Sequence, residues 1–387
     1  MKILMINVVC GIRSTGRICT DLAVALEAHG HEVKIAYGRE KVPEKFQKYA
    51  VRIGSDFDVK LHGVKARLFD DCGFGSRVIT KKFIKWVQEY DPDVIHLHNV
   101  HGYYIDIETL FSYLRTCGKK IIWTLHDCWA FTGHCVYFDY VGCDKWKTKC
   151  HHCIQKKEYP VCIGLDQSKK HFEKKKEIFT GITNLILVTP SKWLANLVQQ
   201  SFLGAYPVIV IHNGVNTDIF KPTESNIREK YSLGNKKVVL GVAAIWDRRK
   251  GFEDFIELSK ILTAEYQIIL VGLSETQMKI IPNNIIGITR TDNVQELAAL
   301  YSLASVLVNP TLEDNYPTTN IEAIACGTPV ITYNTGGSVE SARMYGIVTE
   351  KNVESLFRAI KEIDSIVPQK VEIDNFYTIE KYLKLYI

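Results

Sequence analysis

The 387-residue sequence has no long apolar segment of the kind that a membrane-spanning helix needs. No stretch approaches the roughly 18 uninterrupted apolar residues of such a helix, and the first residues, MKILMINVV, do not have the layout of a secretion signal. We therefore expect a cytoplasmic protein, either free or peripheral at the inner face of a membrane. With 46% apolar and 24% charged residues, the chain has ample core for two globular domains.

Two common nucleotide-binding signatures are also missing. The loop CGIRSTGR follows a first apolar stretch at residues 3–8 and has neither G-x-G-x-x-G spacing nor the Gly-Lys-Ser/Thr ending of a P-loop. This absence argues against an ordinary dinucleotide or ATP site. The small residues between Gly11 and Gly16 nevertheless form a loop at the carboxyl end of a strand, where open α/β sheets bind ligands.

Short apolar strands alternate with amphipathic helices along the whole chain, without internal repeats. This alternation predicts an α/β protein with two doubly wound parallel sheets. The predicted strands are at residues 3–8, 33–37, 94–97, 121–125, 185–188, 208–211, 238–242, 267–271, 285–288, 306–308 and 330–333. The predicted helices are at residues 17–29, 83–90, 192–199, 252–262, 294–304 and 377–387. We expect the domains to divide between Ser201 and Pro222.

One stretch, LVNPTLEDNYPTTNIEAIACGTPVITYNTGG, predicts a strand, a polar loop, a helix and a second strand. The helix is expected to hold Pro317, Thr318 and Thr319 in its first turn and to end at Gly327. Unpaired N–H groups and the helix dipole in that first turn favour a phosphate. Glu322, one turn further on, is better matched to sugar hydroxyls, so the pair of features indicates a nucleotide. The alternative is an ordinary buried βαβ unit with surface acids.

The spacing Asp314-x7-Glu322, followed by AIACGTPVI, resembles the E-x7-E signature of retaining glycosyltransferase family 4. The resemblance implies a GT-B fold, in which two Rossmann-like domains face each other across a cleft, here residues 1–205 and 206–372, with a final helix at 373–387 crossing back. It also implies that Glu322 binds the ribose of a nucleotide-sugar donor. Asp314, where the family has Glu, would lie against the donor sugar.

A second basic stretch supports the same interpretation. Arg248, Arg249 and Lys250 follow the strand at 238–242 and could neutralise a diphosphate leaving group. The family usually has an Arg five residues before its Lys-Gly, where this sequence has Ile245. Lys250 therefore corresponds to a family residue, and Arg249 could substitute for the missing Arg by proximity. The alternative is an exposed basic turn.

Further residues follow from the resemblance. His126, at the tip of the strand at 121–125, corresponds to a family histidine near the transferred sugar. The stretches HNGVNTDIF and GGSVE resemble the family's N-G-V-D-x-x-x-F and G-G-x-x-E. The predicted catalytic residues are His126, Lys250 and Asp314. The predicted donor-binding residues are Gly16, Asn213, Arg248, Arg249, Asn315, Tyr316, Pro317, Thr318, Thr319, Glu322 and Glu340.

Eleven cysteines are many for a cytoplasmic chain, where disulfides are disfavoured. Cys135, Cys143, Cys150 and Cys153 stand at C-x7-C-x6-C-x2-C in an aromatic-rich insertion at residues 128–162. The close pair resembles half of a zinc knuckle, and four thiolates would complete a closed structural zinc site. The alternative is free cysteines that pack the insertion. No catalytic metal is expected.

The net charge of +5 suits an anionic substrate or membrane surface and does not call for nucleic acid. Seven lysines gather between residues 156 and 176. They indicate either a solvated helix face or a surface for anionic lipid headgroups.

The resemblance thus implies a retaining hexosyltransferase that moves sugar from a UDP- or GDP-sugar to a hydroxyl of a glycan or lipid-linked oligosaccharide in bacterial polysaccharide synthesis. One alternative is a GT-B epimerase or hydrolase of the nucleotide sugar itself. Another is a non-catalytic nucleotide-sugar-binding protein, because Asp314 and Ile245 replace expected residues.

Overall fold

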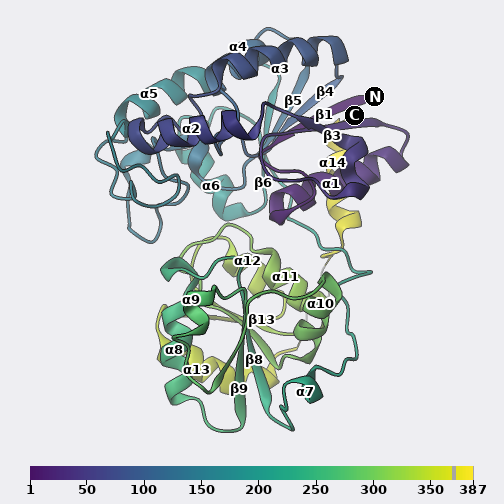
Figure 1. Cartoon of the computed structure of the whole chain (residues 1–387), viewed down its shortest axis with the longest axis vertical. Helices are drawn as coiled ribbons and strands as arrows, with labels where there is room; N and C mark the ends of the chain where they lie inside the picture. Colours follow the sequence, from purple (N-terminus) through teal and green to yellow (C-terminus); the bar gives the residue numbers. More distant parts are fainter. Residues whose placement is uncertain (368–371, 387) are drawn as a thin grey trace. The chain divides into compact units, whose positions relative to one another are not determined.

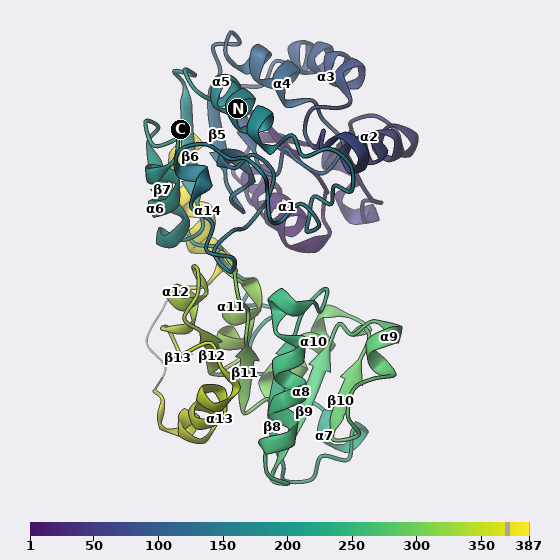
Figure 2. The same ribbon diagram turned by 90° about the vertical axis from the view of Figure 1, so that its left-hand side faces the viewer.

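The computed structural model describes residues 1–367 and 372–386. The chain divides into an N-terminal unit, Met1–His212 joined by the residues from Ile379 on, and a C-terminal unit, Asn213–Thr378. Each unit is built around one sheet (Figures 1 and 2).

The N-terminal unit contains a seven-stranded sheet in the order β3-β2-β1-β4-β5-β6-β7, and every pairing is parallel. Its strands are β1 (Lys2–Asn7), β2 (Glu32–Tyr37), β3 (Ala50–Arg52), β4 (Val94–Leu97), β5 (Lys120–Thr124), β6 (Leu185–Thr189) and β7 (Val208–Val210). Its helices are α1 (Arg13–Ala28), α2 (Asp56–Phe69), α3 (Arg77–Tyr90), α4 (Ile107–Leu114), α5 (Ser168–Phe179), α6 (Lys192–Gln200) and α14 (Asn375–Tyr386).

Helices cover both faces of this sheet. Because successive side chains of a strand point to opposite faces, Ile3 and Met5 of β1 join one core cluster, and Leu4 and Ile6 join the other. The helices α1 and α14 pack on the first face, whereas α3, α4, α5 and α6 pack on the second.

The C-terminal unit contains a six-stranded parallel sheet in the order β10-β9-β8-β11-β12-β13. Its strands are β8 (Lys237–Val242), β9 (Tyr266–Val271), β10 (Ile285–Ile288), β11 (Val306–Asn309), β12 (Val330–Tyr333) and β13 (Gly346–Thr349). Its helices are α7 (Ile227–Lys230), α8 (Phe252–Ile261), α9 (Glu275–Met278), α10 (Val294–Leu303), α11 (Thr318–Ala325), α12 (Ser338–Ala342) and α13 (Val353–Glu362).

Helices again form a layer on each side of the sheet. In Figure 1, α8 and α13 lie on one side of the C-terminal sheet, and α10 and α11 lie on the other. Val306 and Val308 pack toward α8 and α13, and Leu307 packs toward α10, α11 and α12. The predicted α/β class with two doubly wound parallel sheets is confirmed.

This strand order decides where the C-terminal unit can bind a ligand. The chain runs outward in one direction from β8 to β10 and then returns to add β11 beside β8. In such sheets the loops that leave the two central strands diverge to opposite faces and open a crevice between them. The loops after β8 and β11 carry Lys250 and Asp314, two of the predicted catalytic residues.

Two predicted boundaries near the candidate binding loops were wrong. The helix α1 begins at Arg13, so Ser14, Thr15 and Gly16 lie in its first turn and are not part of a loop. The helix α11 begins at Thr318, and Pro317 is the capping residue that precedes it.

The last helix belongs to the core of the N-terminal unit. Tyr382 and Tyr386 of α14 are buried, and their hydroxyls lie 3.0 Å from Thr124 Oγ1 and 2.6 Å from His96 Nδ1. In the described part of the chain, no helix has both the length and the apolar character needed to cross a membrane.

Replacing Tyr386 by Ala should destabilise the N-terminal unit by about 3–5 kcal/mol, the range for removing a large buried aromatic ring. Urea unfolding, followed by far-UV circular dichroism, measures the change. Phe376 lies on the same helix and is 57% exposed, so Phe376→Ala serves as the control. Equal stability of the two variants would contradict the core position of α14.

Candidate active site

Two loops meet at the crevice of the C-terminal sheet. The loop after β8 ends in a single 3-10 turn, η4 (Arg248–Lys250). Its Arg249 carbonyl accepts a hydrogen bond from the Leu312 N–H at 2.8 Å, and the Arg249 guanidinium donates to the Glu313 carbonyl at 3.2 Å. Gly251 has a φ of 73°, and a Cβ there would lie 2.5 Å from the Pro310 carbonyl oxygen. Only glycine therefore permits this close approach.

Lys250 and Asp314 form the central ion pair of the site. The ammonium of Lys250 donates to Asp314 Oδ2, and the two side chains are only 22% and 14% exposed. The Asn315 N–H donates to the other carboxylate oxygen at 2.9 Å. Burial raises the pKa of Asp314, but the charges of Lys250 and Arg249 outweigh this effect and hold the pKa below its ordinary value. Asp314 is therefore ionised at neutral pH.

The first turn of α11 lies directly after this pair. Thr318 and Thr319 are partly exposed, and the turn contains no acidic side chain. Glu322 follows on the same helix, is 4% exposed, and accepts a hydrogen bond from the buried Tyr301 hydroxyl at 3.0 Å. One helix thus presents N–H groups suited to an anion and, about one turn later, a carboxylate suited to hydroxyl groups.

A buried polar network under α11 was not predicted from the sequence. Asn320 accepts a hydrogen bond from the Asn309 amide at 2.8 Å and donates to Ser338 Oγ and Ser341 Oγ at 3.2 and 2.9 Å. The network joins β11, α11 and α12, and it therefore fixes the start of α11. Buried Asn and Ser near predicted helix starts are the signal that could have identified it.

Other predicted donor residues surround these loops. Asn213 donates to the Tyr316 carbonyl at 3.3 Å. Burial, with a smaller contribution from the charge of Glu340, raises the pKa of Tyr316, so Glu340 of α12 lies near that ring. Pro317 and Asn315 are buried in the loop, and Arg248 is exposed. Ile245 is 66% exposed.

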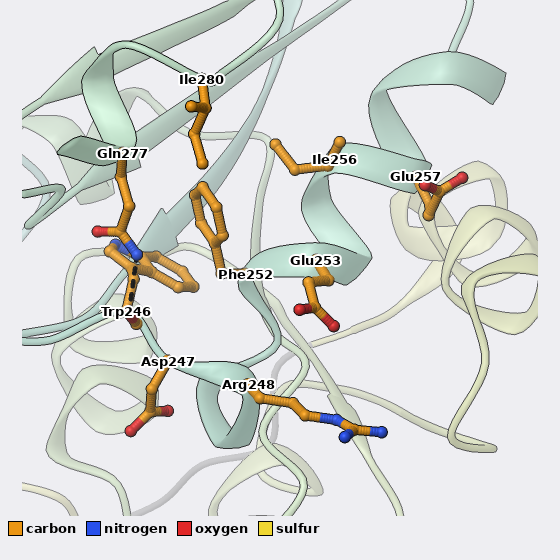
Figure 3. A pocket seen from close by; sticks show the side chains of 9 residues that line it. All are labelled: Trp246, Asp247, Arg248, Phe252, Glu253, Ile256, Glu257, Gln277 and Ile280. Atoms are coloured by element: carbon orange, nitrogen blue, oxygen red, sulfur yellow. Dashed lines mark hydrogen bonds between the residues drawn. The ribbon is translucent and has the colours of Figure 1, made fainter.

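The cavity shown in Figure 3 lies beside η4 and has a volume of about 470 Å³. Arg248 is the only predicted donor residue among those that line it. The carboxylates of Asp247, Glu253 and Glu257 also line it, which suits a diphosphate poorly. The cavity is lined by Trp246, Asp247, Arg248, Phe252, Glu253, Ile256, Glu257, Gln277 and Ile280.

In the N-terminal unit, His126 lies in the loop after β5, separated from the strand by Leu125, and is half-buried. Its Nε2 lies 3.0 Å from Nδ1 of His98, which follows β4, and the two rings stack. Burial lowers the pKa of His126 to about 4, so the imidazole is neutral at pH 7. Gly16 lies in the first turn of α1.

A histidine–aspartate pair next to His126, formed by His101 and Asp127, was not predicted. His101 Nε2 lies 2.9 Å from Asp127 Oδ2, and its Nδ1 lies 3.2 Å from the Tyr159 hydroxyl. Asp127 also accepts the Trp129 N–H at 2.9 Å. These contacts join the loops after β4 and β5 to the cysteine-rich insertion.

The four predicted zinc ligands line one small cavity together with His134 and His151. All eleven cysteines are free thiols. As placed, no three His, Cys, Asp or Glu side chains among the described residues form a group that could hold a metal ion.

The lysines between residues 156 and 176 were expected on an exposed surface, and for Lys175 this prediction was wrong. Its side chain is buried and its ammonium donates to the carbonyls of Trp129 and Thr132, at 2.8 and 3.2 Å. Lys174 pairs with Glu108 at 2.6 Å. The lysines of α5 that remain exposed are Lys169, Lys170 and Lys176.

Comparison with known proteins identifies the class. The profile of "Glycosyl transferases group 1" matches residues 236–364, and that of "Glycosyltransferase Family 4" matches residues 15–219, more than half of the chain. Solved structures of similar fold include a glycosyltransferase from Rickettsia africae and HepE from Anabaena in complex with UDP-glucose. The Rickettsia structure has a TM-score of 0.68 and 15% sequence identity, and the match covers 100% of this chain and 97% of that one. The HepE complex has a TM-score of 0.62 and 14% identity, and the match covers 98% of this chain and 92% of that one. The protein is a glycosyltransferase with the GT-B fold.

Curated relatives agree with this class. WcaC of Escherichia coli, named as a glycosyl transferase of colanic acid biosynthesis, is 25% identical over 287 residues, which are 70% of this chain and 67% of WcaC. The processive diacylglycerol alpha-glucosyltransferase of Acholeplasma laidlawii is 28% identical over 163 residues, 39% of this chain and 48% of that enzyme. The chain belongs to Glycosyltransferase Family 4.

Replacing Lys250 by Met should lower the stability of the C-terminal unit by about 1.5–3 kcal/mol at pH 7, the range for a hydrogen bond to a charged group. In the wild type, the pKa of Asp314 is lowered. The ion pair with Lys250 therefore stabilises the fold fully at pH values above the ordinary carboxyl pKa, and this stabilisation is lost as the pH falls below that pKa. The deficit of the variant should therefore be fully present from pH 7 down to the ordinary carboxyl pKa of 3.8. It should shrink as the pH falls further, because protonated Asp314 needs no cation.

Urea unfolding at several pH values measures this deficit. Lys260 pairs with Glu257 on the surface of α8, with both side chains more than half exposed, so Lys260→Met should cost little at any pH. A deficit of Lys250→Met that does not depend on pH would contradict the role of the ion pair.

Proposed function

We propose that this enzyme transfers a sugar from a nucleoside-diphosphate sugar to a hydroxyl group of a glycan or lipid-linked acceptor, with retention of anomeric configuration. The observation that carries the proposal is the Lys250–Asp314 pair at the crevice of the C-terminal sheet, immediately before the first turn of α11. A ligand with an anionic diphosphate and a polyhydroxylated sugar matches the cation, the helix N–H groups and the carboxylates that gather there.

The donor is assigned to this site residue by residue. In the proposal, the N–H groups of Thr318 and Thr319 and the side chains of Lys250 and Arg249 bind the diphosphate, and Glu322 binds the ribose hydroxyls. Asp314 accepts hydrogen bonds from the transferred sugar. The complexes of HepE with UDP-glucose make UDP-sugars the first donors to test.

The chemistry requires a stabilised leaving group. As the glycosidic bond to the diphosphate breaks, negative charge develops on the departing oxygen, and in this proposal Lys250 and Arg249 stabilise it. Positive charge develops on the anomeric centre, near the Asp314 carboxylate. An acceptor hydroxyl then attacks on the face that the diphosphate leaves and passes its proton to an oxygen of the departing diphosphate, so the configuration is retained.

The acceptor is proposed from the relatives and from the surface charge. WcaC is named for colanic acid, and the Acholeplasma enzyme for diacylglycerol, which indicate a glycan or lipid acceptor. The exposed Lys169, Lys170 and Lys176 of α5 could attract an anionic membrane surface.

Replacing Glu322 by Gln should weaken UDP binding by roughly tenfold to a hundredfold, because the neutral amide accepts weaker hydrogen bonds from the ribose. The Tyr301 hydroxyl can still donate to the glutamine oxygen, so the fold should be preserved. Titration calorimetry with UDP measures the change. Glu257→Gln on the exposed side of α8 is the control, and equal affinities for the two variants would rule out the ribose assignment.

The reaction itself can be tested with UDP-, GDP- and ADP-sugars against candidate acceptors. We expect release of nucleoside diphosphate only when acceptor is present, and NMR of the product should show the anomeric configuration of the donor. Inversion would contradict the mechanism. Donor consumption without acceptor would indicate the epimerase or hydrolase, and binding without turnover on any acceptor would indicate a non-catalytic protein.

A further inference from the structure

We propose that the insertion between β5 and α5 holds a structural zinc ion, and that its ligands are Nε2 of His134 and the thiolates of Cys143, Cys150 and Cys153. This ligand set differs from the four cysteines that the sequence alone suggests, because it includes His134 and excludes Cys135. The assignment is independent of the donor chemistry of the C-terminal unit.

The insertion has little regular structure to hold it together. Between Thr132 and Gln167 it contains no strand, and its only helical element is the 3-10 turn η3 (Lys145–Lys147). It nevertheless buries Trp146 and Cys150. Segments of this kind are commonly cross-linked by a metal ion, whose binding free energy adds directly to the stability of the fold.

All the proposed ligands line one cavity. Its volume of about 20 Å³ is close to what a single water-sized occupant needs. The cavity is lined by His134, Cys135, Phe138, Cys143, Lys145, Trp146, Cys150, His151, Cys153 and Ser168.

His134 has the arrangement of a metal-ligating histidine. Its Nδ1 lies 2.5 Å from Oδ1 of Asp70, and the two side chains are 0% and 3% exposed. An ionised carboxylate accepts the proton of Nδ1, which leaves the lone pair on Nε2. That Nε2 is buried and has no hydrogen-bond partner among the described residues. A carboxylate that fixes the tautomer of a histidine in this way is a recurrent second partner of zinc ligands.

The sulfur atoms of Cys150 and Cys153 already accept hydrogen bonds. The Gly133 N–H donates to Cys150, and the Gln155 N–H donates to Cys153. In a metal site, N–H groups in these positions hold the bound sulfur atoms in place. A Cβ at position 133 would lie 2.8 Å from Cβ of Cys150 and 2.1 Å from the Ser168 carbonyl oxygen. Because glycine has no Cβ, the N–H of residue 133 can approach the sulfur of Cys150.

Cys135 has a different role. Its sulfur is hydrogen-bonded to the sulfur of Cys153. In the proposal, the S–H group of Cys135 donates in this contact. An S–H group that donates to the sulfur of a ligand supports that ligand and does not bind the ion itself. Cys135 also adjoins His134 in the chain, and two adjacent residues seldom turn both side chains toward one ion. We therefore assign Cys135 as a supporting residue.

A buried lysine, Lys175, lies near the site, and burial lowers its pKa to about 7. Three thiolates and Zn²⁺ carry a net charge of −1. The buried ammonium of Lys175 donates to the carbonyls of Trp129 and Thr132 and lies 3.3 Å from the centre of the Trp129 ring. Cys150 is among its electrostatic partners. A metal centre with this net negative charge would favour the charged form of Lys175.

Binding must move these side chains, because no three of them among the described residues are yet grouped to hold an ion. The sulfur atoms need to turn toward one point at about 2.3 Å and Nε2 at about 2.0–2.1 Å. Each thiol that binds releases its proton. The resulting site would stabilise the segment that carries Tyr159. The hydroxyl of Tyr159 lies 3.2 Å from Nδ1 of His101.

Metal analysis of the full-length protein, purified without chelators, is the first test. We expect about one zinc per chain, with cysteine and histidine as ligands. After exchange for Co²⁺, the absorption spectrum should show tetrahedral ligand-field bands and sulfur-to-cobalt charge transfer. Removal of the metal should lower the melting temperature. Wild-type protein that neither contains nor takes up Zn²⁺ or Co²⁺ would overturn the proposal.

Variants then test the ligand set. His134→Asn can still donate to Asp70 but lacks the second nitrogen, and it should lose at least tenfold in zinc affinity, as should Cys143→Ser and Cys153→Ser. Cys135→Ser keeps a donor toward Cys153 and should retain the metal. Cys162→Ser, at a buried cysteine that donates to the Leu165 carbonyl, is the control for general disruption.

Loss of metal in Cys135→Ser together with its retention in His134→Asn would show a four-thiolate site and overturn the histidine assignment. Circular dichroism confirms that each variant is folded. The Co²⁺ spectrum of the wild type decides the geometry even where a variant fails to fold.

Discussion

The approach of the turn after β8 to the loop after β11 determines what the C-terminal unit can bind. Backbone hydrogen bonds between Arg249 and Leu312, and the absence of a side chain at Gly251, bring the two loops into contact. This contact places the charge of Lys250 beside Asp314, so a cation and a carboxylate share a partly buried position. The Asn320 network then fixes the first turn of α11 next to them. Two loops that are separated by some sixty residues therefore act as one binding surface.

The regular elements could be predicted largely from the sequence. Short apolar runs such as 285–288, 330–333 and 94–97 correspond to β10, β12 and β4 without a shift, because buried parallel strands are apolar on both faces and end at polar loops. The start of α1 was missed because Ser14, Thr15 and Gly16 have low helix propensity, and the tertiary structure outweighs that preference.

The contacts of the site were less predictable. The motif Asp314-x7-Glu322 identified the loop and helix, but the partners of those residues come from distant segments. Tyr301 for Glu322 and Asp70 for His134 are examples, and nothing in local sequence pairs them. Lys175 shows the same limit: its neighbours in the sequence indicate a solvated face, yet it points into the core. Side-chain pairing across a fold depends on the three-dimensional arrangement of elements, which periodicity does not encode.

The helix α14 has a consequence for how the protein can be divided. Its first residues group with the C-terminal unit, but from Ile379 it belongs to the N-terminal unit, where Tyr382 and Tyr386 contact Thr124 and His96. A recombinant fragment that stops near residue 212 would uncover an apolar strip along β1, β4 and β5 and leave two buried polar side chains without their phenol partners. The N-terminal half is therefore encoded in two separate parts of the gene, and isolating it requires grafting the final helix back onto the fragment.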